Sequence, residues 1–152
     1  MTISHGRNLY FGVTTPSGAA LVSLSAYTSE VNGMPGEQDL GDVTVAGNLG
    51  HTSYPGLQKC SFTSKHTMAT STTATTAWAV FDDFQALQQT YPSTPWVVYF
   101  GPKGTTAGYP LLECSAWIKS LSLPIKVTDP NLFDISWDMT GGTTGMTIGV
   151  WT

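Results

Sequence analysis

A two-residue alternation of apolar and polar side chains constrains the fold of this chain more than any other feature. In residues 112–118 the even positions are Leu, Cys, Ala and Ile, and the odd positions are Glu, Ser and Trp. Residues 133–139 and 146–151 repeat the pattern, and in residues 60–66 the even positions share one face. Successive side chains of a β-strand point to opposite faces, so each segment is predicted to be a strand with one face in the core.

Further strands are bounded by turn residues. Residues 9–13 form a short predicted strand that ends at the turn Thr15-Pro16-Ser17-Gly18, and residues 21–27 are predicted to pair with it as a hairpin. Strands are also expected at 42–45 and 57–68, and the apolar run 96–100 predicts a central strand followed by a hairpin turn. About eight strands indicate an all-β fold, a β-sandwich or barrel of two packed antiparallel sheets.

One flanking α-helix is predicted after residue 76. Thr75 or Thr76 is expected to cap its start, and Pro92 to end it. Asp82 and Asp83 are expected near its positive end. A single helical stripe is formed by the apolar residues Val80, Phe84, Leu87 and Tyr91.

The remaining segments are read as loops within a single domain, residues 1–152. The longest is an exposed loop at about 28–41, which contains Asn32-Gly33 and Pro35-Gly36 and has too few apolar residues for a core. A second loop is predicted at 46–56, and a Thr-rich polar linker at 67–76 has no assigned role.

The composition is unusually poor in charge. Charged residues make up 11% of the chain, against about 25% in an ordinary soluble domain. Such a surface is a weak solubility coat for a free monomer and suits a protein that is covered by copies of itself. A secreted Thr- and Ser-rich binding domain has the same composition. The net charge is −4 and the basic residues are scattered, which disfavours a nucleic-acid-binding surface.

No sequence signal directs the chain to a membrane. It has no run of 18 apolar residues, and its first residues do not have the apolar core of a signal peptide. The protein is therefore expected to be made and assembled in the cytoplasm.

The sequence predicts no catalytic, metal or cofactor site. Cys60 and Cys114 lie on apolar strand faces and are expected to be buried free thiols. His66 shares a strand face with Cys60, but strand geometry separates them by about 20 Å, so the imidazole is expected to be half-exposed and inactive. His5 and His51 lack a second ligand at metal spacing.

The tryptophans leave a carbohydrate-binding hypothesis open. Trp96 and Trp137 are expected in the core and Trp78 on the helix, whereas Trp117 and Trp151 are expected to point outward, where an indole can stack on a sugar.

Several short, turn-dominated motifs follow one another along most of the chain. They are His5-Gly6-Arg7, Asp42-Val43-Thr44-Val45-Ala46-Gly47-Asn48, Tyr54-Pro55-Gly56-Leu57, Val98-Tyr99-Phe100-Gly101-Pro102, Gly104-Thr105-Thr106-Ala107-Gly108, Ser115-Ala116, Phe133-Asp134-Ile135-Ser136-Trp137 and Thr140-Gly141. Their order resembles that of the tail tube (major tail) proteins of long-tailed, non-contractile bacteriophages.

This resemblance implies a virion structural protein without catalytic residues or cofactors. The implied assembly is a stack of hexameric rings in the phage tail, through which DNA passes without specific binding. The implied partners are further copies of the chain, the tape measure protein, the tail terminator and the distal tail protein. Two other readings remain: a tail terminator or capsid decoration protein on the same fold, and a carbohydrate-binding module.

The resemblance also implies roles for two groups of residues, one in contact between rings and one in the channel wall. The segment at 28–41 is longer than in the relatives, and it is expected to contact the next ring through Glu30, Asn32, Met34, Glu37 and Asp39. Acidic residues on the polar faces of strands are expected to line the channel and repel DNA. These lumen candidates are Asp42, Glu113, Asp134 and Asp138.

Overall fold

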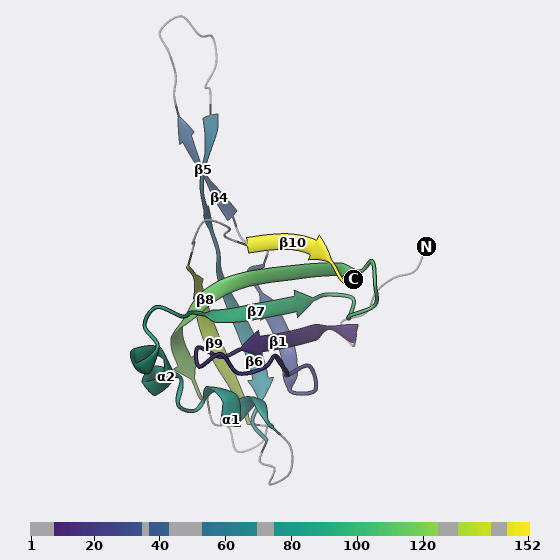
Figure 1. Cartoon of the computed structure of the whole chain (residues 1–152), viewed down its shortest axis with the longest axis vertical. Helices are drawn as coiled ribbons and strands as arrows, with labels where there is room; N and C mark the ends of the chain where they lie inside the picture. The colour runs from purple at the N-terminus through teal and green to yellow at the C-terminus, as the bar shows by residue number, and fades with distance from the viewer. Residues whose placement is uncertain (1–7, 35–36, 43–52, 70–74, 125–130, 141–145) are drawn as a thin grey trace, which may run out of the picture.

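The protein is built on one antiparallel sheet and a separate two-stranded ribbon (Figure 1). A computed structural model describes residues 8–34, 37–42, 53–69, 75–124, 131–140 and 146–152, with side chains of 37–42 and 53–59 outside the description. The sheet order is β2-β1-β7-β8-β9-β6-β3, and β10 also pairs with β8. Its strands are β1 (Tyr10–Thr14), β2 (Val22–Ser23), β3 (Thr28–Asn32), β6 (Ser61–Thr67), β7 (Trp96–Gly101), β8 (Pro110–Ser122), β9 (Leu132–Met139) and β10 (Met146–Val150).

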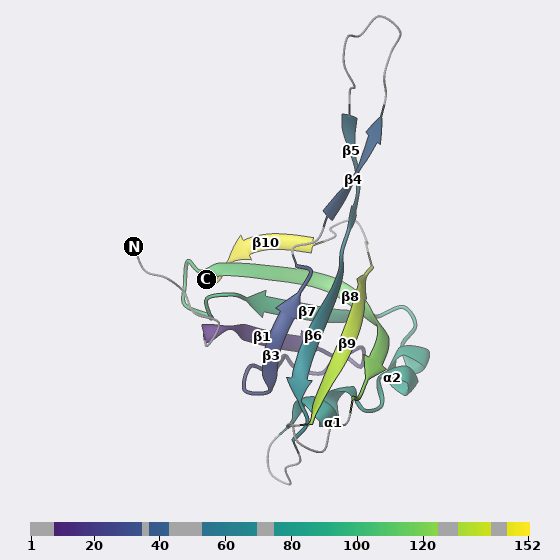
Figure 2. The same ribbon diagram turned by 180° about the vertical axis from the view of Figure 1, so that it is seen from behind.

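Strand β8 folds this sheet into two layers. Its first half pairs with β7 and β10, and its second half pairs with β9. The register with β9 shifts between Ile118 and Ser120, a bulge of the kind that lets a strand turn a corner between sheets. The layer β2-β1-β7 therefore faces the layer β9-β6-β3 across a shared core (Figures 1 and 2). The predicted all-β fold is confirmed, and the sheet does not close into a barrel.

The core between the layers is aromatic. Phe81, from the helical segment, lies at its centre and is fully buried. Its ring centroid is 5.3 Å from that of His66, 5.5 Å from Trp96 and 5.8 Å from Trp137. The predicted inward faces are confirmed in β6, β8 and β9, where buried and less buried residues alternate. Alternation along these three strands thus supplies a large part of the core.

The predicted helix is present as two short helices, α1 (Ala77–Phe81) and α2 (Phe84–Thr90). As predicted, Thr76 caps the start, its Oγ1 accepting from the Ala79 N–H at 3.3 Å. The helix breaks at Asp82-Asp83, so Asp82 ends α1, whereas Asp83 is the N-cap of α2 and lies at a positive end as predicted. The predicted stripe continues across the break as far as Leu87: Val80 is buried, Phe84 and Leu87 pack against the core, and Tyr91 is 39% exposed. Neither helix in the described part of the chain is long and apolar enough to cross a membrane.

The expectation of a loop at 28–41 is wrong. Residues 28–32 form β3, which pairs with β6, and Glu37–Asp42 form β4, which pairs with β5 (Ser53–Lys59). β3 is an edge strand of a polar sheet face, and the β4–β5 ribbon projects from the body (Figures 1 and 2). β3 does not bury a whole face, and neither β3 nor β4 carries the apolar alternation by which strands are recognised in sequence.

Two other strands also differ from expectation. β2 has only two residues, because its pairing with β1 is limited to Ser23 and Val22. In β10 the predicted inward residues Ile148 and Val150 are 66% and 57% exposed. Both lie opposite residues at the open end of β8, where no described element covers them.

One side chain completes the sheet where a strand ends. The pairing of β7 with β8 stops at Ala116. Beyond it, Gln88 of α2 accepts from the Ile118 N–H at 2.8 Å and donates to the Ile118 carbonyl at 3.2 Å. The same oxygen accepts from Trp96 Nε1 at 3.1 Å. Gln88 therefore takes the place of a further strand residue and anchors α2 to the corner of the sheet.

Candidate functional site

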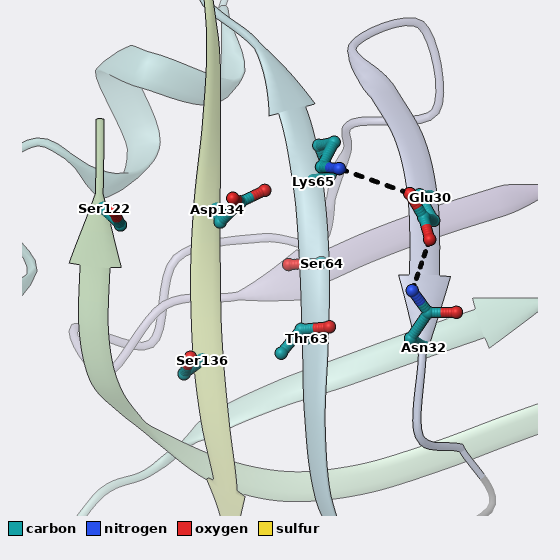
Figure 3. Close-up of a pocket in the computed structure, with 8 residues that line it drawn as sticks. All are labelled: Glu30, Asn32, Thr63, Ser64, Lys65, Ser122, Asp134 and Ser136. Atoms are coloured by element: carbon teal, nitrogen blue, oxygen red, sulfur yellow. Dashed lines mark hydrogen bonds and ion pairs between the residues drawn. The ribbon is translucent and has the colours of Figure 1, made fainter. Parts of the chain in front are cut away.

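The outer surface of β3, β6, β9 and the second half of β8 is mainly polar, and it is called the polar face below (Figure 3). Its apolar members are Trp117, opposite Asp138, and Leu132 at the start of β9. The strand registers set its side chains in rows that cross all four strands. One row consists of Glu30, Lys65, Asp134 and Ser122, and the next of Asn32, Thr63, Ser136 and Ser120.

The polar face is hollowed rather than flat. A hollow of about 340 Å³ lies over the first row, lined by the residues drawn in Figure 3. A second, of about 250 Å³, lies beside it along β9 and includes Ser61, Lys119 and Asp138. The lining is dominated by hydroxyl, amide, carboxylate and ammonium groups, because the same alternation that directs Phe62 and Trp137 inward directs their neighbours outward.

Each lysine of the polar face lies beside a carboxylate. Lys65 Nζ is 3.4 Å from Glu30 Oε2, and Lys119 Nζ is 4.0 Å from Asp138 Oδ2. A hydrogen bond from the Asn32 amide and the neighbouring Lys65 ammonium together hold the pKa of Glu30 below its usual value. The described charges are three acidic groups (Glu30, Asp134, Asp138) and two lysines, a net charge of −1. The face therefore presents no lysine without an acidic neighbour.

The four predicted lumen residues do not form one surface. Asp134 and Asp138 lie on the polar face. Glu113 lies on the outer face of the other layer, opposite Tyr99, where burial and the Glu113 charge raise the pKa of the phenol. The outer faces of two packed layers point away from each other, so Glu113 is separated from the two aspartates. Asp42 ends β4 opposite Ser53, and its side chain is outside the description.

The predicted ring-contact residues are also divided. Glu30 and Asn32 belong to the polar face, and Met34 packs against the core. Glu37 and Asp39 belong to β4 in the projecting ribbon, and their side chains lie outside the described part of the chain. The strands therefore place the first two residues on a sheet and only the last two in a projection.

The cysteines are buried free thiols, as predicted. Burial raises the pKa of both thiols, that of Cys114 to about 12. Cys60 Sγ donates to the Gly33 carbonyl at 3.7 Å. A thiol with a raised pKa carries almost no thiolate at neutral pH, so neither residue is suited to nucleophilic chemistry.

His66 was expected to be half-exposed and is fully buried. The Thr28 hydroxyl donates to the Leu24 carbonyl at 2.9 Å, so it accepts from His66 Nδ1 at 3.0 Å. Ser64 Oγ accepts from Trp137 Nε1 at 2.9 Å and donates to His66 Nε2 at 2.8 Å. The imidazole is therefore neutral, with its proton on Nδ1, in a directed chain of hydrogen bonds from β9 through β6 to β3.

The surroundings of His66 oppose its protonation. Its ring lies 5.2 Å from Phe11, 5.3 Å from Phe81 and 5.4 Å from Phe133. The aromatic rings and hydroxyl groups around it carry no charge, and burial lowers its pKa to about 4. Both ring nitrogens are occupied by structural partners, so His66 is not placed to act as a general base. Within the described ranges, no three His, Cys, Asp or Glu side chains gather as they do at a metal site.

The tryptophans give little support to a sugar platform. Trp96 and Trp137 are buried in the core, as expected, and Trp78 packs edge-on against Phe133 at 5.5 Å. Trp151 packs edge-on against Tyr10 at 5.1 Å, so its ring is engaged within the chain. Trp117 is half-buried beside the core.

We predict that His66 makes the protein acid-sensitive. Its folded pKa of about 4 lies below the unfolded value of about 6.5, so the unfolded chain binds the proton more readily between these values. The free energy of unfolding should fall by about 1.4 kcal/mol per pH unit as the pH drops through this window, and the loss should cease below pH 4. Urea unfolding at several pH values measures the slope. The slope should vanish in His66→Gln, and its persistence there would assign it to other groups.

No family model matches the chain, and no curated protein matches it. Among solved structures, the SPP1 tail tube superposes with a TM-score of 0.63 at 12% identity, covering 97% of this chain and 80% of that one. The tail of an empty gene transfer agent particle, refined with C6 symmetry, has a TM-score of 0.62 at 10% identity, covering 99% and 100%.

A third similar structure is the tube-terminating cap of the anti-feeding prophage. Its TM-score is 0.63 at 14% identity, and the match covers 99% of this chain and 93% of that one. The superposition extends over nearly the whole of this chain in all three cases, although the identities are too low to show more than a common fold. The family resemblance of the sequence motifs is thus confirmed in the fold: this chain is folded like the subunits of tail tubes.

Proposed function

We propose that this chain is the repeating subunit of a phage tail tube, and that it assembles into stacked hexameric rings around a channel for DNA. The whole-length likeness to tail and tube structures carries this proposal. The assembly belongs to the virion tail and is completed in the host cytoplasm. It also includes a tape measure protein, a terminator and a distal tail protein. The chain has a structural role and no enzymatic one.

The polar face is proposed to line the channel. DNA carries a negative charge about every 1.7 Å along its axis, and unpaired lysines would bind it. On this face Lys65 and Lys119 lie beside Glu30 and Asp138, and the other side chains are mainly hydroxyls and acids. Such a wall offers DNA neither a cationic grip nor an apolar surface.

The β4–β5 ribbon is proposed to contact the next ring. It forms a sheet of its own and projects from the two layers, so it adds reach without adding to the core (Figure 2). In this proposal Glu37 and Asp39 keep the ring-contact role expected from the sequence, and Glu30 and Asn32 no longer have it.

A tail terminator is the second candidate, because a tube-terminating cap has the same fold. A capsid decoration protein and a carbohydrate-binding module have no such observation in their favour. The number of rings that the protein forms separates a tube subunit from a terminator.

We predict that the purified chain forms rings and tubes of uniform width in electron micrographs. Single rings that never stack would identify a terminator. Monomers that form no ring at any concentration, in a protein shown to be folded, would overturn both readings; a glycan array would then test the carbohydrate-binding one.

We predict that lysines on the polar face slow DNA ejection. Asp134 and Asp138 are about 13 Å apart along β9, so the double change to Lys adds two cationic bands per subunit. Both side chains are on the outer surface, so tubes should look normal and particles should package DNA. Ejection should be several-fold slower, because the added lysines attract the DNA phosphates. The matched control is Glu113→Lys on the other layer, which should eject at the normal rate. Normal ejection from the double variant would refute the placement of this face.

We predict that the ribbon is dispensable for folding and required for stacking. Gly33 and Cys60 lie side by side, with the Cys60 thiol bonded to the Gly33 carbonyl, so a short Gly-Ser link from Met34 to Cys60 can replace residues 35–59. The shortened chain should keep the circular dichroism and melting temperature of the body. In electron micrographs it should give single rings. Tubes of normal length would remove the ribbon from the ring contact.

A further inference from the structure

The described edges of the sheet differ sharply in how they are protected against pairing. β2 is only two residues long. β3 carries Glu30 and a register shift between Thr28 and Glu30, and the second half of β8 is occupied by Gln88. Charges, bulges, short length and covering side chains are the devices by which proteins block edge-to-edge association.

β10 has none of these devices. Its sequence, Met-Thr-Ile-Gly-Val, contains no charge and no proline, and it pairs with β8 over five residues without a register shift. On its other side no described strand lies beside it. It is therefore the one edge of the described sheet with the length, regularity and composition to accept another strand.

The main-chain geometry of β10 supports this reading. Trp151 N–H donates to the Tyr109 carbonyl at 3.0 Å, and the Trp151 carbonyl accepts from the Gly108 N–H at 2.8 Å, so the main chain of Trp151 faces β8. Main-chain groups face the partner strand at every second residue of an antiparallel ladder, so those of Gly149 and Thr147 also face β8. The main-chain N–H groups of Ile148 and Val150 therefore point to the open edge.

The side chains of the same two residues are exposed on the core side of the layer. Ile148 lies opposite Leu112, and Val150 opposite Pro110, so both continue the face that Leu112 buries. They are 66% and 57% exposed in the single chain. At about 25 cal/mol per Å² of apolar area, covering them would favour association.

We propose that β10 is the strand by which one copy of this chain joins the next. A strand of the neighbouring copy pairs with the main chain of β10 from Ile148 to Val150, and the same copy covers the Ile148 and Val150 side chains. This inference rests on the proposed ring assembly, and structures with this fold include one refined with six-fold symmetry. Pairing of β10 with β10 would give closed two-fold dimers, so a ring requires β10 to meet a different surface of its neighbour.

The first test places charge on the exposed residues. Ile148→Lys with Val150→Lys should fold normally, because both side chains are already in solvent in the single chain. It should raise the concentration for half-assembly by about tenfold or more, measured by analytical ultracentrifugation. Thr147→Lys is the matched control: it adds charge to the same strand on the opposite face and should assemble much more readily. Assembly of the double variant at the wild-type concentration would overturn the proposal.

Hydrogen exchange at single-residue resolution tests the edge itself. In the monomer the amides of Ile148 and Val150 should exchange fast, and those of Thr147 and Gly149 slowly. In assembled particles all four should be protected. If tubes form while the Ile148 and Val150 amides stay fast, the β10 proposal fails and the tube function stands. If the wild-type chain forms no oligomer at all, both fail.

Discussion

The fold depends on β8, because this strand belongs to both layers. Its first half lies between β7 and β10, and its second half pairs with β9. The bulge at 118–120 turns the strand so that the inner faces of the two halves meet. At this turn Ile118 loses a strand neighbour, and Gln88 supplies the missing donor and acceptor. The helical segment is therefore held by the same corner that creates the core into which Phe81 is packed.

Buried polar groups fix the register of the second layer. The chain from Trp137 through Ser64 and His66 to Thr28 connects three neighbouring strands by directional bonds. A slip of β6 by one residue would turn Lys65 into the core and His66 to solvent, and it would break every bond in that chain. The orientation of the polar face is thus set from inside: because Ser64 and His66 point inward, Thr63 and Lys65 point outward. The proposed channel wall therefore depends on a network of side chains that are buried beneath it.

The strands with strong alternation were predictable, and the edges were not. Residues 112–118 and 133–139 bury the expected faces because a core demands apolar side chains at every second position. β3 and β4 were not predicted, because an edge strand or a strand of a projecting ribbon does not require apolar side chains at every second position. One sequence signal was available for the corner: apolar residues move from the even position Ile118 to the odd positions Leu121 and Leu123, which marks an inserted residue. Nothing in the sequence distinguishes Gln88 from its neighbour Gln89. Alternation distinguishes the inner face of a strand from its outer face, but it does not show to which layer the strand belongs. Glu113 was therefore grouped with Asp134, although the two side chains point to opposite sides of the molecule.

The edges of the sheet give a physical reason for the low charge of the chain. A soluble monomer with this many strands ordinarily protects every long edge with charge, because an open edge is a template for uncontrolled association. Here the polar face carries Glu30 at the β3 edge together with Lys65, Lys119, Asp134 and Asp138, and the other described charges lie at the helix break, in the turn after β7 and at Glu113. β10 carries none. With β10 as the one unprotected edge of the described sheet, edge-to-edge association is confined to this strand, and a ring forms when β10 meets a different surface of the neighbouring copy. The placement of the charges, more than their number, favours ordered assembly of this chain over aggregation.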